Sequence, residues 1–207
     1  MYKKVSLLFL IAVLTASSAM AQYVADIGIQ AGLNYANFWG SDAGDNQMKP
    51  GIILGVVIDG TKVMKRQESN FSSQLGLLFV QQGAKIEDED IEMTLNYLRI
   101  PVNYRYNFYF GSNMGLYLQA GLYGGLALWG TAKERVDGKW ESETINFREN
   151  DMNPWDWGLG VGIGVHIMDN FQIGLSKDWG RNSLMKYKDV NQRFYNTNLA
   201  LTVTYLF

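Results

Sequence analysis

Histidine, the side chain most often used for acid–base catalysis and metal binding, occurs once in this chain, at position 166. One histidine gives at most one candidate for a His-paired nucleophile, and no serine and acid can be matched to it. The acidic residues from Glu87 to Glu92 could bind calcium, but their spacing lacks the glycine and the alternation of a calcium-binding loop. The sequence therefore predicts no catalytic residue, cofactor-binding residue or metal ligand, and it predicts that His166 fills the interior.

Five charged residues are more informative, because they lie on the small or polar parity of alternating segments. They are Asp26, Arg99, Arg105, Asp156 and Asp178. An arginine on a lipid-facing parity near the membrane midplane would cost about 2–4 kcal/mol, so this parity must face the interior. Isolated charges inside are also costly, so the five residues are predicted to form a lumen charge network. Arg105 and Asp26 are expected at the same depth and are therefore predicted to pair.

These charges would be positioned by β-strands, because in eight segments large apolar residues alternate with small or polar residues at a period of two. In residues 155–168, Trp155, Trp157 and the aliphatic residues share one parity, and four glycines and His166 share the other. The eight segments are residues 26–38, 51–59, 71–86, 94–108, 115–129, 155–168, 171–179 and 195–207. Large apolar residues outside and small or polar residues inside are typical of membrane barrels. The sequence predicts an all-β fold, an eight-stranded antiparallel up-and-down transmembrane β-barrel.

The N-terminal residues resemble a secretory signal peptide. Lys3 and Lys4 precede an apolar run over residues 5–14, and Ala19 and Ala21 match the small-residue cleavage pattern. Residues 1–21 are therefore expected to be removed, leaving one outer-membrane β-barrel domain over residues 22–207. The chain has no cysteine and a formal net charge of −2. An acidic chain without a basic stripe is not expected to bind nucleic acid.

Aromatic residues are expected at both lipid–water interfaces, where barrel aromatics gather. The predicted interface aromatics are Trp39, Trp155, Trp157 and Trp179 at the external ends of strands, and Tyr106, Phe108, Tyr205 and Phe207 at the periplasmic ends. Long joins follow strands one, five and seven, and short joins follow strands four and six, which places both termini in the periplasm. The basic join over residues 60–70 is longer than this rule predicts. Asp137 and Gly138 predict a hairpin that continues above the membrane.

Three segments resemble the PorT-like outer-membrane β-barrel proteins of the Bacteroidetes. They are the Tyr-Leu-Arg-Ile-Pro run at residues 97–101, the Gly-rich residues 116–125, and the Asp-Trp-Gly-Leu run at residues 156–159. The resemblance implies an outer-membrane location and a fold without shared active-site chemistry. One member of that family is linked to protein secretion, so an accessory role in secretion or cell-surface assembly is implied.

The sequence leaves two function classes open. The first is a structural or interaction protein with a filled lumen, whose partners would be outer-membrane lipid and lipopolysaccharide and other envelope proteins. Its C-terminal Phe207 resembles the aromatic signal that the barrel-assembly machinery recognises. The second is a small-solute porin or an outer-membrane enzyme, which would need a continuous polar path or a polar triad.

Overall fold

A computed structural model describes residues 25–40, 46–66, 68–86, 91–111, 113–136, 139–147, 149–185 and 194–207. The expected signal peptide, residues 1–21, lies outside these ranges. The strands are β1 (Asp26–Trp39), β2 (Asn46–Asp59), β3 (Phe71–Ile86), β4 (Ile91–Phe110), β5 (Met114–Val136), β6 (Lys139–Ile145), β7 (Trp155–Ile167), β8 (Phe171–Gly180) and β9 (Tyr195–Leu206). One helix, α2 (Thr61–Arg66), joins β2 to β3. Within the described ranges, no helix is both long and apolar enough to cross a membrane.

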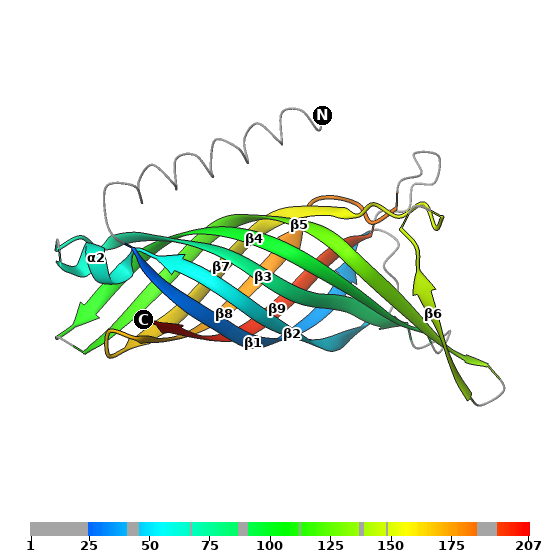
Figure 1. The fold of residues 1–207 in the computed structure, drawn as a ribbon, viewed down its shortest axis with the longest axis horizontal. Coiled ribbons are helices and arrows are strands. Elements are labelled where there is room, and N and C mark those ends of the chain that lie inside the picture. The colour runs from blue at the N-terminus through cyan, green and yellow to red at the C-terminus, as the bar shows by residue number, and fades with distance from the viewer. Residues whose placement is uncertain are drawn as a thin grey trace.

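Eight of the strands form a closed antiparallel ring (Figure 1). Their order is β4-β3-β2-β1-β9-β8-β7-β5, and β5 pairs with β4 to close the ring. The first and last strands are joined in register, for example Ile29 opposite Tyr205. This confirms the predicted eight-stranded barrel. Closure leaves the ring without a free sheet edge, which is what a strand-built membrane span requires.

Alternation along the strands separates an apolar outer wall from a polar interior. On β1, Ile29 and Leu33 are 51% and 57% exposed, whereas Asn34 is fully buried. On β2, Ile52, Leu54, Val56 and Ile58 are all exposed and form the outward face of the strand. Outward aliphatic side chains therefore surround the ring, where lipid would cover them.

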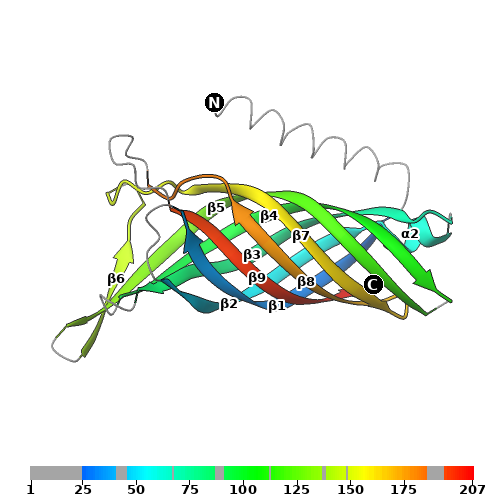
Figure 2. The same cartoon turned by 180° about the vertical axis from the view of Figure 1, so that it is seen from behind.

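A two-stranded ribbon projects from one end of the barrel, and Figure 2 shows it from behind. The upper part of β5 pairs with β6 from Gly130 opposite Ile145 to Val136 opposite Lys139. The predicted continuation of the hairpin is thus confirmed, but it adds a separate ninth strand outside the ring; the turn at residues 137–138 lies outside the described ranges. We call this the ribbon end and the opposite end, where α2 and the C-terminus lie, the helix end.

The join between β2 and β3 contains a short helix that the sequence did not predict. Asp59 Oδ1 accepts a 2.8 Å hydrogen bond from the Thr61 backbone nitrogen, which starts the turn that becomes α2. Gly60 then accepts a 2.9 Å hydrogen bond from the Met64 backbone nitrogen. A six-residue helix is too short to show an amphipathic period and depends on tertiary contacts. This helix explains why the join exceeds the length expected of a short turn.

Candidate functional site

Strand β4 places two inward arginines at different depths of the barrel. Arg99 and Arg105 are both 3% exposed and lie six residues apart on the same parity. At a rise of about 3.3 Å per residue, their backbones are roughly 20 Å apart along the strand. Each arginine is therefore the centre of a separate cluster of charged and polar side chains.

The Arg105 cluster is closely hydrogen-bonded. Arg105 Nη1 lies 2.6 Å from Asp59 Oδ2, and both residues are buried. The guanidinium also donates to three amide oxygens, those of Gln172 at 2.9 Å, Gln74 at 2.8 Å and Gln119 at 3.1 Å. The Tyr117 ring lies 4.4 Å from the guanidinium carbon. Hydrogen bonds from several directions offset the cost of burying this ion pair.

The Arg99 cluster joins one arginine to two acids. Arg99 Nη1 lies 2.9 Å from Asp178 Oδ2, and Nη2 lies 3.7 Å from Asp156 Oδ2. The guanidinium carbon is 3.8 Å from the centre of the Tyr123 ring. Asn196 Nδ2 donates a 3.1 Å hydrogen bond to Asp156 Oδ2. The cluster therefore connects β4, β5, β7, β8 and β9 across the interior.

The structure brings four of the five predicted network residues into these clusters and places the fifth elsewhere. Asp26 lies 3.6 Å from Lys62 of α2, and Asp59 takes the predicted place of Asp26 beside Arg105. Asp26 and Asp59 are opposite each other in the β1–β2 register, so the two acids differ in strand and not in register, and β2 lies one strand closer to β4 than β1 does. The outward phase of Ile58 puts Asp59 on the inward parity, and this was the signal that could have identified it.

The single histidine lies in the interior near the helix end. His166 Nε2 is 3.0 Å from Asn107 Oδ1, and the His166 ring is 4.9 Å from the Tyr117 ring. In the described part of the chain, its hydrogen-bond partner is thus an amide. This is the environment of a packed interior side chain, and it supplies no serine or acid to the imidazole.

A cavity of about 60 Å³ separates the two arginine clusters. Its polar lining includes Arg99, Arg105, Gln119 and Asp178, together with the rings of Tyr117 and Tyr123. A polar space of this size holds a few water molecules.

Loop residues cover the interior at the ribbon end. Ile145 at the end of β6 and the loop residues Phe147, Met152 and Leu184 are buried, and they pack with Phe38, Ala84, Leu95 and Tyr97 of β1, β3 and β4. Two backbone hydrogen bonds hold the loops together, Asn153 nitrogen to Leu184 oxygen at 2.7 Å and Leu184 nitrogen to Phe194 oxygen at 2.9 Å. We call these eight residues the apolar plug. Loop residues have no strand period, so no pattern in the sequence indicated it.

At the helix end, α2 is attached to distant parts of the chain. Lys62 Nζ donates a 3.1 Å hydrogen bond to the Phe207 backbone oxygen. Lys65 Nζ lies 2.9 Å from Asp169 Oδ1 in the β7–β8 turn. The basic join therefore crosses from the β2–β3 side of the ring to β7, β8 and β9.

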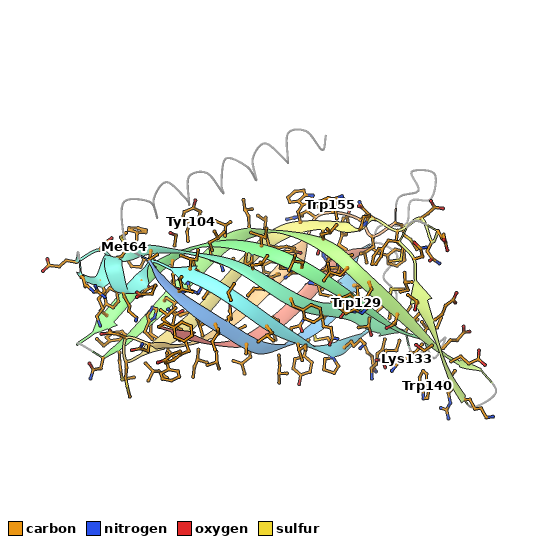
Figure 3. All side chains as sticks on the ribbon, viewed as in Figure 1. Met64, Tyr104, Trp129, Lys133, Trp140 and Trp155 are labelled. Carbon is orange, nitrogen blue, oxygen red and sulfur yellow. The ribbon has the colours of Figure 1, made fainter. Side chains whose placement is uncertain are left out.

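The predicted interface aromatics lie at strand ends on the outward parity. Trp39, Trp155, Trp157 and Trp179 lie toward the ribbon end, where Figure 3 shows Trp129 and Trp155 on the outer surface. At the helix end, pairs of rings contact one another: Phe71 with Tyr106, Tyr106 with Phe108, Phe171 with Tyr205, and Tyr205 with Phe207, at centroid distances of 4.8–5.4 Å. Two aromatic belts thus bound an apolar band.

Several solved structures are similar to this chain at low sequence identity. Neisserial surface protein A is 16% identical, with a TM-score of 0.44 over 87% of this chain and 97% of that one. Ail, the attachment invasion locus protein of Yersinia pestis, is 14% identical, with a TM-score of 0.44 over 88% and 99%. A major outer membrane protein from Thermus thermophilus is 16% identical, with a TM-score of 0.47 over 89% and 100%. No curated protein sequence matches the chain.

The family comparison covers most of the sequence. Residues 20–186 match the family described as the outer membrane protein beta-barrel domain, which is more than half of the 207 residues. The matched span includes β1 to β8 and both arginines of β4. The closed ring, the apolar outer wall and the two aromatic belts fit that description. The chain belongs to the outer membrane protein beta-barrel domain family and is an outer-membrane protein.

Proposed function

We propose that this protein is a non-conducting outer-membrane barrel of the structural or interaction type, acting through its surface and not through its lumen. The observation that carries the proposal is that side chains and a helix block the lumen at successive depths along the barrel axis. The apolar plug lies at the ribbon end, the Arg99 and Arg105 clusters cross the middle, and α2 crosses the helix end. An eight-stranded barrel is only about wide enough for side chains to fill, so few obstacles are needed.

The proposed orientation puts the ribbon end outside the cell and the helix end in the periplasm. The ribbon is well suited to contact another envelope protein, because Trp140 is 57% exposed at a site away from lipid. Its neighbours Lys139, Glu141 and Glu143 are also exposed. Figure 3 shows Trp140 and Lys133 on the projecting strands. An exposed tryptophan beside charges of both signs is typical of a protein-binding surface.

We place the protein in the PorT-like branch of the family, with an accessory role in protein secretion or cell-surface assembly. Two of the segments that resemble this branch face one another inside the barrel. Arg99, from the Tyr-Leu-Arg-Ile-Pro run, lies 3.7 Å from Asp156, the first residue of the Asp-Trp-Gly-Leu run. This contact inside the barrel gives a physical reason for an arginine in the first run and an aspartate in the second. The C-terminal Phe207 lies beside Tyr205 on the outer wall, where the assembly machinery could recognise it.

Electrical recording tests the proposal directly. The folded protein reconstituted in planar bilayers should give no steady conductance at neutral pH. A combined Phe147→Ala, Met152→Ala and Leu184→Ala variant should stay silent as well, because both arginine clusters remain. Stable single-channel steps from porin-free protein would instead favour the small-solute porin. Turnover of a lipid or peptide that is lost on His166→Ala would favour the enzyme.

A further inference from the structure

Lys177 on β8 has a different environment from the other charged residues of the barrel wall. It lies opposite Val161 on β7 and Leu199 on β9, with no register shift in either pairing. Both neighbours are on the outward parity, so Lys177 also points toward lipid. Among the described residues between the two aromatic belts, it is the one charged side chain on that parity. The adjacent Asp178 points inward, where Arg99 binds it.

The depth of Lys177 brings its amine close to the ribbon-end interface. Trp179 follows two residues later on the same face, so Lys177 lies about 5 Å below it along the membrane normal for a strand tilted by about 40°. A lysine stem can span this distance and place its charge at the interface. The amine would then sit at the level of the ribbon-end aromatics.

A second cation, Arg181, follows Lys177 at the ribbon end of β8. The Arg181 backbone nitrogen donates a 2.7 Å hydrogen bond to the Trp157 oxygen, which continues the β7–β8 pairing by one residue. The Arg181 guanidinium carbon is 6.0 Å from the centre of the Trp39 ring, and that ring is 5.1 Å from the Tyr195 ring. We call Lys177, Trp179, Arg181, Trp39 and Tyr195 the rim cluster. It spans β8, β9 and β1 on the outer wall.

The rim cations contrast with the lysines at the helix end. Lys62 and Lys65 each lie within 4 Å of an aspartate, at 3.6 Å and 2.9 Å. Lys177 and Arg181 form no salt bridge with any residue in the described ranges. Within the described part of the chain these two cations on the outer wall have no protein anion, and at the membrane interface the phosphates of lipid headgroups can supply one.

We propose that the rim cluster binds the phosphate of a phosphorylated glycolipid of the lipid A type in the outer leaflet. Lys177 and Arg181 contact the phosphate from below and above, and the three aromatic rings pack against the sugar and the upper acyl chains. The outer-leaflet assignment rests on the orientation given under the proposed function, with the ribbon end outside. Recognition itself depends on two cations and a phosphate.

Native mass spectrometry of the detergent-refolded protein, titrated with bisphosphorylated lipid A, tests the site independently of orientation. One-to-one complexes are expected. Each of Lys177→Gln and Arg181→Gln should weaken binding about fivefold, and the double variant about 25-fold, because a cation near a lipid surface contributes about 1 kcal/mol. Lys177→Arg should retain binding. Arg135→Gln/Lys139→Gln, which removes two exposed cations from the ribbon, is the matched control and should bind like wild type.

Three results would overturn the proposal. The first is equal affinity of the double variant and wild type, with heat-dependent gel mobility showing that both are folded. The second is equal binding of dephosphorylated lipid A, which would assign the affinity to acyl chains alone. The third is equal binding of phosphatidylglycerol, which would make the site one for any anionic lipid. If only the proposed orientation is wrong, surface labelling of cells would show it. The affinities measured here would then stay unchanged.

Discussion

Arg105 and Asp59 form an ion pair across the barrel interior, with Nη1 and Oδ2 2.6 Å apart and both side chains buried. Arg105→Met should lower the free energy of unfolding by about 3–5 kcal/mol, because it leaves a buried carboxylate without its cation. The double variant Arg105→Met/Asp59→Asn should lose less than the sum of the two single changes. Urea unfolding in lipid vesicles measures all three values.

Asp26 supplies the control for that cycle. It lies on β1 beside Lys62 at the helix end, so Asp26→Asn should cost at most about 1 kcal/mol, as for a partly exposed ion pair. Its effect should add to that of Arg105→Met, since Asp26 is paired with Lys62 and Arg105 is paired with Asp59. Coupling of Arg105 to Asp26 as strong as that to Asp59 would contradict the observed pairing.

Inward glycines on β7 are paired with large inward residues on the neighbouring strand β5, and this complementarity can be tested at single glycines. A Cβ at Gly164 would overlap the Tyr117 ring and the Ile173 backbone oxygen. Gly164→Val should therefore prevent formation of the heat-resistant folded band or lower its melting temperature strongly. Gly125→Ala is the comparison, because its Cβ would meet nothing closer than 3.6 Å. Equal tolerance of both changes would mean that the Tyr117 ring does not pack against Gly164 as described.

The proposed orientation predicts which ends a membrane-impermeant thiol reagent reaches. The chain has no cysteine, so single cysteines report without background. Glu141→Cys on the ribbon should react in intact cells, and Asn113→Cys in the β4–β5 turn should react only after the outer membrane is permeabilised. Both positions are exposed in the structure, which makes them a matched pair. The reversed pattern would invert the barrel.

Acid should loosen the ribbon-end extension of β2, β3 and β4. The Lys49 ammonium lies 2.9 Å from Glu92 Oε1, and this hydrogen bond lowers the pKa of Glu92, which lies beyond the ribbon-end belt. An acid with a lowered pKa in the folded state stabilises the fold at pH values above its unfolded-state pKa. This stabilisation is lost as the pH falls through the folded-state pKa. The protection factors of backbone amides near Glu92, which are corrected for the pH dependence of intrinsic exchange, should therefore fall below about pH 5 by an amount worth at most about 1 kcal/mol.

Glu92→Gln separates this effect from general acid sensitivity. The variant should have lower protection factors than wild type at pH 7 and should lose less protection on acidification. Glu141→Gln, an exposed acid on β6, should follow the wild-type profile. Identical profiles for all three proteins would show that the Lys49–Glu92 contact does not stabilise the extension.

Features that follow from a period of two could be predicted from the sequence, and features set by local or long-range contacts could not. Parity alone predicts that Arg99 and Arg105 lie inside, and both are buried. Asp26 and Asp59 are opposite each other in register, so depth along the barrel does not distinguish them, and the partner of Arg105 depends on which strand lies closer to β4. The loop residues of the apolar plug and the helix α2 lie in joins without periodicity, and their positions depend on chain segments that are distant in sequence.

The contact between Lys62 and the Phe207 backbone oxygen has a kinetic consequence, because it joins residues 145 positions apart. The seam between β1 and β9 also joins the two extremes of the domain, so its loop-closure entropy is the largest in the ring. We expect this seam to form late in folding and the Lys62 contact to form after it. Once formed, that contact ties the final residue to the β2–β3 join and slows reopening of the seam.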